Sequence, residues 1–240
     1  MAAGDPTAVR ASGLRPGAYA AVVFGLGLLL TGLALPQFLA ALARVGGDAA
    51  LTAVGAGRDL PPRQVERAMR SRRNAANMWP THEDMSDIAL LQLSGARQMD
   101  LDRQSGQRRL QLDRAIGSAR QAIALNAGNP YSWMRLAEGL FLRNGLDDET
   151  AAAVVRAMEL GPAVQQMILP RLELAFLLDA QLTEPQRAVV EEQIRLAVLW
   201  NPAGLVRHAR RRYAVGIVRR ALASTPDRLA VFDAAWEASR

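Results

Sequence analysis

The longest apolar stretch of the chain lies near its N-terminus. Between Arg15 and Arg44 there are 28 residues without a charged side chain, and the segment from Tyr19 to Leu35 is almost entirely apolar. About 20 helical residues cross the roughly 30 Å hydrocarbon layer of a bilayer. The pattern therefore predicts one transmembrane helix over residues 17–43, with Pro36 marking a kink or the exit from the membrane.

A cleaved secretory signal is the alternative interpretation of this segment. Arg10 and Arg15 precede it, and Ala41-Leu42-Ala43 has the small-x-small form of a cleavage site. Signal cores usually contain about 7 to 15 apolar residues, fewer than this segment has, so a retained anchor is favoured. The positive charge of residues 1–16 favours a short cytoplasmic tail, which leaves the larger C-terminal part on the periplasmic side of a bacterial inner membrane.

Three small residues recur at intervals of four within the predicted membrane helix. Gly17, Ala21 and Gly25 would lie on one helix face, where a second helix can approach closely. The alternative is that Gly and Ala are simply common in membrane helices. These three residues are the candidates for helix association.

The region after the membrane segment divides into a linker and a helical domain. Residues 44–60 are rich in Gly and Ala and predict a linker or a loosely held short helix. Helix-start signals recur in residues 61–240, whereas alternating apolar and polar strand patterns do not occur. The helix starts are expected at Pro61-Pro62, Thr81, Asn129-Pro130 and Thr183. The sequence therefore predicts an all-α domain.

Apolar residues in this domain follow helical spacing. Leu112, Ile116, Ala119 and Ile123 step by four, three and four residues, which puts them on one helix face. A short pattern also recurs at positions 122–127, 157–162 and 197–202. Each copy reads as a helix end followed by a turn. Such self-similarity at nearly regular intervals indicates a structural repeat.

One of these repeats carries the residues of a known pattern. After Asn129-Pro130 come Trp133, Leu136, Ala137 and Leu140. Here the chain resembles the tetratricopeptide repeat, a helix pair with a period of about 34 residues whose first helix carries W-x-x-L-G/A-x-x-Y. The best match covers residues 129–162, departing from the family at Leu140, where Tyr is preferred, and by about one extra residue in the turn between the helices. The resemblance implies an α-solenoid, and an irregular helical bundle is the alternative.

The flanking units match less well. In residues 162–202 we expect Pro170 to interrupt the first helix and residues 182–185 to lengthen the internal turn. Upstream, residues 88–99 and 112–125 are expected to form a helix pair joined by a polar stretch. Stacked pairs leave a concave surface lined by the first helix of each pair. The candidates for partner contacts there are Tyr131, Arg135, Glu138 and Arg143, whose alternative role is that of a solvated helix face.

The amino-acid composition excludes several kinds of catalytic and metal-binding site. All 29 basic residues are Arg, Cys is absent and there are two His, for a formal charge of +6. Schiff-base lysines, thiolate nucleophiles and Cys-based metal sites are therefore excluded. The segment from His82 to Asp87 lacks the second His that a zincin helix requires, and reads as acids in a first helical turn. We expect no enzyme activity, no cofactor and no metal.

Arginines concentrate again near the C-terminus, from Arg207 to Arg220. Their interpretation stays open between a solvated face, a site for an acidic protein or anionic lipid or polymer, and nucleic acid, which scarce aromatic residues disfavour. The candidates in this cluster are Arg207, Arg211 and Arg212.

Taken together, these features predict a membrane-anchored scaffold or adaptor with a protein partner. The Lys-free, Ala- and Arg-rich composition is typical of a bacterium with a GC-rich genome, and similar anchored repeat proteins often accompany envelope polysaccharide synthesis or export. Two alternatives remain: a periplasmic binder of an anionic polymer or lipid through the Arg207 to Arg220 cluster, and a secreted helical enzyme.

Overall fold

A computed structural model describes residues 16–100 and 103–239, and the described residues form eleven helices and no strand. The predicted all-α class is confirmed. The N-terminal tail, with Arg10 and Arg15, lies outside the described residues. The helices are α1 (Pro16–Gly55), α2 (Pro62–Met78), α3 (His82–Arg97), α4 (Ser105–Leu125), α5 (Pro130–Asn144), α6 (Asp148–Leu160), α7 (Gln165–Leu177), α8 (Glu184–Trp200), α9 (Pro202–Arg211), α10 (Val215–Leu222) and α11 (Pro226–Glu237).

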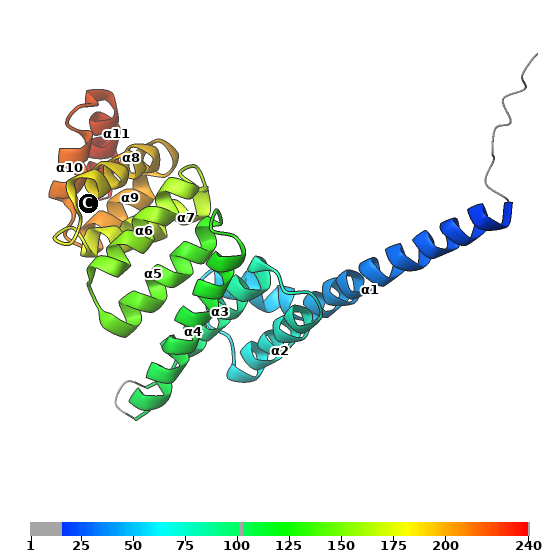
Figure 1. Ribbon diagram of the computed structural model, residues 1–240. Helices are drawn as coiled ribbons and strands as arrows, with labels where there is room; N and C mark the ends of the chain where they lie inside the picture. The colour runs from blue at the N-terminus through cyan, green and yellow to red at the C-terminus, as the bar shows by residue number, and fades with distance from the viewer. Residues whose placement is uncertain (1–15, 101–102, 240) are drawn as a thin grey trace, which may run out of the picture.

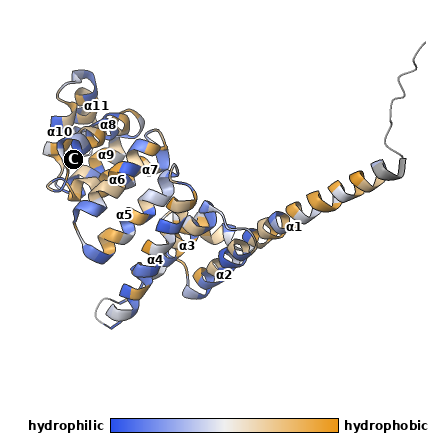
Figure 2. Cartoon of the chain, viewed as in Figure 1, coloured by the Kyte–Doolittle hydropathy of each residue, from blue (hydrophilic) through white to orange (hydrophobic). Residues whose placement is uncertain are grey.

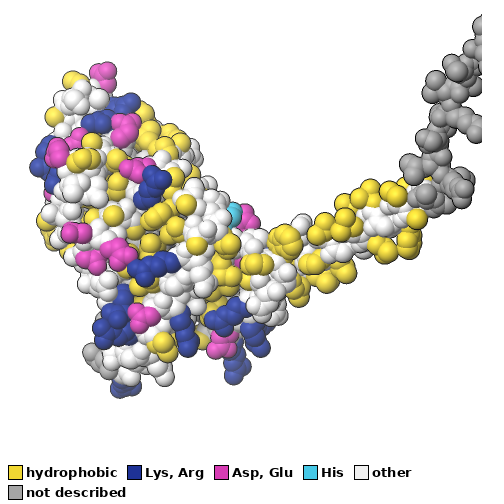
Figure 3. All heavy atoms as spheres, in the orientation of Figure 1, with side chains coloured by type: hydrophobic (Ala, Val, Ile, Leu, Met, Phe, Trp, Pro, Cys, Tyr) yellow, Lys and Arg dark blue, Asp and Glu magenta, His cyan; other side chains and the backbone are white. Residues whose placement is uncertain are grey.

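Helix α1 projects from the other helices as a rod (Figure 1), and its projecting half is strongly apolar (Figure 2). From Tyr19 to Leu35 its apolar side chains are exposed, as the space-filling view also shows (Figure 3). By length and composition alone, this helix is suited to cross a membrane. It continues through Pro36 without a break.

The structure differs from the predicted linker over residues 44–60. Residues 44–55 continue α1 and pack against α2 and α3. Gly46 and Gly47 face Ser71 of α2, and Gly47 allows the closest approach: a Cβ added there would lie 3.3 Å from Ser71 Oγ and 3.4 Å from the carbonyl oxygen of Ala68. Only residues 56–61 connect α1 to α2. The rod and the domain therefore share one continuous helix.

The predicted helix starts are confirmed. Thr81 is the N-cap of α3, and its hydroxyl accepts a hydrogen bond from the amide of Asp84 at 3.2 Å. Asn129 caps α5 in the same way through the amide of Tyr131, at 2.8 Å. Thr183 precedes α8, where its amide donates to Gln186 Oε1 at 2.9 Å. These caps satisfy amides that a helix start leaves without partners.

The helices follow one another in space in their chain order (Figure 1). Each packs against the next, and additional contacts join α1 to α3, α3 to α5, α6 to α8 and α7 to α9. In the C-terminal part, α8 also contacts α10 and α11, and α9 contacts α11. Helices α10 and α11 lie at the end remote from α1. The expected pairing of residues 88–99 with 112–125 is present as the α3–α4 contact.

A continuous core joins α3 to α11 and contains 33 buried residues, mostly Ala, Leu and Val. Small residues permit close approach: a Cβ at Gly139 on α5 would lie 2.9 Å from Ile116 Cγ1 on α4. The expected interruption of a helix at Pro170 is wrong, because α7 runs through it. Burial of Ile168 and Leu172 on either side outweighs the hydrogen bond that a proline removes.

Candidate functional site

A groove of about 330 Å³ opens along the first helices of successive pairs. Its apolar wall comes from α5 and α7, and includes Met134, Phe141, Leu174 and Leu177. Arg97 at the end of α3 and Arg212 after α9 lie at its margins. Residues from α3, α5, α7 and the end of α9 therefore line one surface, which combines apolar side chains with charged side chains of both signs.

Carboxylates from the middle helices hold the arginines at both margins. Glu138 Oε2 on α5 lies 3.2 Å from Arg97 Nη2 and 3.4 Å from Arg135 Nη1. On α7, Glu173 Oε1 accepts a hydrogen bond from Arg212 Nη2 at 2.7 Å. These side chains are partly exposed, so the pairs orient the charges more than they stabilise the fold.

His208 adds a titratable group beside Glu173. Its Nδ1 lies 3.1 Å from Glu173 Oε2. Burial lowers the pKa of His208 below its ordinary value, Glu173 opposes that effect, and the charge of Arg211 lowers the pKa further. The lowered pKa favours the neutral imidazole beside the Glu173 carboxylate.

The structure brings together some of the residues singled out from the central repeat and separates others. Glu138 lines the groove and Arg135 is its ion-pair partner. Tyr131 is 41% exposed one turn before Arg135 on the same helix face. Arg143 instead points to α4, where its Nε donates to Asp113 Oδ1 at 2.7 Å. Arg143 therefore lies apart from the groove.

The C-terminal arginines are largely engaged within the domain. Arg210 donates to the carbonyl oxygen of Ser239 at 2.6 Å and lies 4.3 Å from the centre of the Trp236 ring. Arg219 Nη2 pairs with Asp233 Oδ1 at 2.8 Å. Within the described chain, Arg207 and Arg211 form no ion pair with a carboxylate, and Arg212 belongs to the groove margin. The cluster is therefore not one free basic surface.

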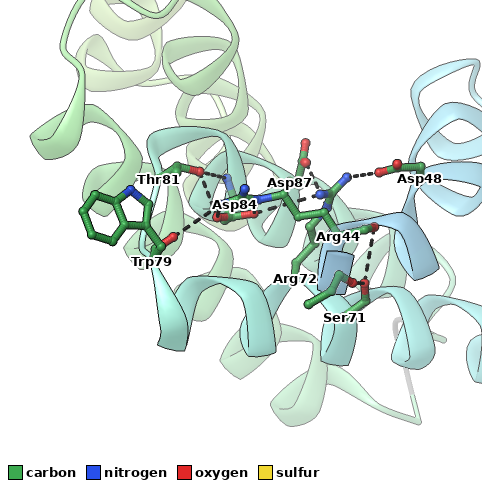
Figure 4. A network of polar contacts seen from close by, with 9 residues as sticks. Arg44, Asp48, Ser71, Arg72, Trp79, Thr81, Asp84 and Asp87 are labelled. Carbon is green, nitrogen blue, oxygen red and sulfur yellow. Dashed lines mark hydrogen bonds and ion pairs between the residues drawn. The ribbon is translucent and has the colours of Figure 1, made fainter. Parts of the chain in front are cut away.

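A second constellation holds α1 to the domain (Figure 4). The carboxylate of Asp84 on α3 is fully buried and accepts two hydrogen bonds from Arg44 on α1, both at 2.8 Å, and one from the Thr81 hydroxyl at 2.8 Å. Arg44 also donates to the carbonyl oxygen of Trp79 at 3.3 Å. A bidentate arginine on a buried carboxylate fixes both position and orientation.

Arg72 on α2 extends this network. It is buried and pairs with Asp48 on α1, and its Nη1 lies 4.0 Å from Asp84 Oδ1. Its Nε lies 3.1 Å from Asp87 Oδ2 but does not form an aligned hydrogen bond. Burial consequently dominates and raises the pKa of Asp87 to about 6, although the charge of Arg72 lowers it. We call Arg44, Asp48, Arg72, Asp84 and Asp87 the junction. Its two arginines and three acids link α1, α2 and α3.

Sequence reasoning missed most of both constellations. It interprets Asp84 and Asp87 as acids of a first helical turn, and the structure confirms the first-turn place of Asp84. Their partners Arg44 and Arg72 lie on two other helices, α1 and α2, and no local pattern links such distant positions. The groove residues Arg97 and Glu173 were missed for the same reason. Because all 29 basic residues are Arg, residue type alone does not single out the arginines that form these ion pairs.

The groove has the features of a binding surface for an extended or helical peptide, because it combines an apolar wall with oriented charges of both signs. The residues predicted for helix association remain untested: Ala21 is exposed, and a Cβ at Gly25 would meet no atom within 4 Å. Gly17 is helical, but its surroundings lie outside the described side chains. Comparison with protein-family models, curated proteins and solved structures finds no match to this chain.

Proposed function

We propose that this chain is a membrane-anchored helical-repeat adaptor, without catalytic activity, that binds a protein partner in the groove. In this proposal α1 crosses a bacterial inner membrane and the domain from α2 to α11 stands in the periplasm. The helix pairs stack in the manner of tetratricopeptide repeats. We further propose that the adaptor acts in envelope polysaccharide synthesis or export.

The packing order supports the stacking part of the proposal. Contacts fall mainly between helices one or two places apart in the chain, as expected for a solenoid. The groove lies where stacked repeats present their first helices, since α3, α5 and α7 line it with the residue that follows α9. That location is the single observation that carries the binding role.

The groove chemistry indicates the kind of partner. Leu174, Leu177 and Phe141 offer an apolar wall to an aliphatic or aromatic side chain. Arg97 and Arg212 also line the groove, and each pairs with a glutamate. An apolar peptide segment flanked by charged residues satisfies both features, and burying its apolar side chains would supply most of the affinity.

Site-specific photocrosslinking tests the groove. A photoreactive amino acid at Leu142 or Leu177, which line the groove, is expected to capture the same protein in native membranes. Matched controls at Leu110 and Leu125, which are exposed on α4, are expected to capture none of it. The change Glu173→Gln together with Glu138→Gln should reduce capture without unfolding the domain. Equal capture from α4 and the groove would contradict the proposal.

Anchoring and orientation have separate tests. A retained helix predicts that the full-length chain remains in carbonate-washed membranes, whereas a cleaved signal predicts a soluble chain that begins near Arg44. Because the chain lacks Cys, a single cysteine at exposed Leu110 reports orientation. A membrane-impermeant maleimide should label it once the outer membrane is opened but before the inner membrane is broken.

A further inference from the structure

The corner between α2 and α3 presents apolar side chains beside the point where α1 joins the domain. Met78 is 45% exposed and Trp79 is 41% exposed. The backbone of Trp79 is held at this point by Arg44, which donates to its carbonyl oxygen at 3.3 Å. Its indole ring points away from the ion network (Figure 4). We call Met78, Trp79 and Pro80 the proximal corner.

The level of this corner along α1 follows from helix geometry. The exposed apolar side chains of α1 extend from Tyr19 to Val45, which is longer than a bilayer core requires. Starting at Tyr19, a core of roughly 30 Å ends near Leu39, because each helical residue rises about 1.5 Å. Arg44 lies about 7 Å farther along the axis by the same rise, which is the depth of lipid headgroups.

Near residues 38–45, α1 contacts the domain on one side and exposes apolar side chains on the other. Ala40 is completely buried, so packing against α1 begins before Arg44. On the other side of the same helix turns, Phe38, Leu42 and Val45 remain exposed. The domain therefore meets α1 within the apolar interval and does not stand clear of it on a flexible linker.

We propose that the proximal corner inserts into the headgroup layer of the membrane that α1 enters, with Trp79 at the boundary between headgroups and acyl chains. The occupant of this surface is lipid. Tryptophan favours this boundary because its ring is apolar and its N–H is polar. This inference rests on the proposed anchoring of α1.

The net positive charge of α2 is also consistent with lipid at the proximal corner. The helix contains five arginines and one glutamate. Arg70 and Arg73 are exposed in the turns preceding the corner, and within the described chain neither pairs with a carboxylate. At about 9 Å from Trp79 along the helix axis, Arg73 is within a Debye length of the membrane surface. Guanidinium groups there attract lipid phosphates.

Spin labels on single cysteines test the inference in the full chain, which has no native Cys. Labels replace Trp79, Leu30 and Tyr213, and the protein is reconstituted in vesicles of phosphatidylcholine and phosphatidylglycerol. The measurement is the ratio of label collisions with oxygen, which concentrates in lipid, to collisions with a water-soluble nickel chelate. We expect the highest ratio at Leu30, the lowest at Tyr213, which is 96% exposed between α9 and α10, and an intermediate ratio at Trp79.

The outcomes separate this inference from the anchoring proposal. A high ratio at Leu30 with equal, low ratios at Trp79 and Tyr213 would overturn the inference and leave the anchor intact. Low ratios at all three positions would overturn both. An immobile label at Trp79 that excludes both oxygen and nickel indicates protein contact, which also contradicts lipid as the occupant. A label at Met78 repeats the measurement with Trp79 intact.

Discussion

The two halves of α1 have the same backbone and opposite surroundings. From Tyr19 to Leu39 the helix exposes apolar side chains, and from Ala40 to Gly55 it contacts α2 and α3 and carries Arg44 and Asp48 into an ion network. The first half has no protein partner within the described chain, whereas the second is fixed by side chains of α2 and α3. The second half is therefore part of the packing of the domain, and the first half is not.

Glycine has a different role in each half of α1. Gly25 and Gly27 have no atom within 4 Å of an added Cβ, whereas Gly47 lies against Ser71 and the backbone of Ala68. In the first half, glycine leaves a face open; in the second, it allows α2 to approach. Composition alone does not distinguish these roles.

The largest expected effect comes from removing the buried acid of the junction. Asp84→Ala leaves Arg44 and Arg72 without their shared carboxylate in a buried site, so we expect a loss of about 3 to 5 kcal/mol in the free energy of unfolding. The measurement is denaturant unfolding of the full chain in micelles. Asp233→Ala, which breaks an exposed pair with Arg219, is the control and should cost about 0.5 kcal/mol or less. Equal losses would refute the distinction between buried and exposed pairs.

The parts of the fold that depend on local chemistry are predictable from the sequence. Helix caps such as Thr81 and Asn129 act on amides within the same turn, and the sequence patterns predict them correctly. The length of α1 is not predicted, because Gly46 and Gly47 are typical of linkers and only the position of Ser71 on α2 explains them. Tertiary packing overrides local propensity at such positions.

The candidate sites were predictable to a lesser degree. Glu138 was found because it lies on the first helix of the central repeat, at a position that the repeat pattern does not need for packing. Its partner Arg97 and the pair formed by Glu173 and Arg212 come from three other segments, and only the folded chain joins them. Asp84 lies in a segment rich in acids, where nothing local reveals that it alone is fully buried.

A steric change in each half of α1 should have unequal effects. Gly47→Val adds atoms where a Cβ would already lie 3.3 Å from Ser71 Oγ, so we expect a loss of about 1 to 3 kcal/mol in the free energy of unfolding. Gly27→Val, on the open half, should change it by about 0.5 kcal/mol or less. The two variants are compared in the same unfolding assay. A neutral Gly47→Val would mean that α2 does not approach α1 closely.

The junction should also respond to pH. The pKa of Asp87 is about 6 in the folded chain and near its ordinary 3.8 when unfolded, so the folded chain binds this proton more tightly. The resulting stabilisation is complete below about pH 4 and is lost as pH rises through 6. The full shift corresponds to about 3 kcal/mol, which partial exposure of the carboxyl reduces to about 1 to 2 kcal/mol.

Asp87→Asn isolates this contribution. The difference in unfolding free energy between the wild type and the variant should fall as pH rises from 4 to 6 and stay level above about 7. His208, whose pKa is lowered, titrates in both proteins and cancels from the difference. A pH-independent difference would show that burial does not control Asp87.

The smallest effect is expected from the most exposed acid of the same network. The side chain of Asp48 is 59% exposed, and its partner Arg72 keeps Asp84 and Asp87 as neighbours when Asp48 is neutralised. Asp48→Asn should therefore cost about 0.5 kcal/mol or less, because water already screens this pair and Asn has a similar helix propensity. Unfolding at low and high salt provides the measurement, and the small loss should shrink further with salt. A loss comparable to that of Asp84→Ala would mean that contact with Arg72, and not burial of the acid, sets the strength of the junction.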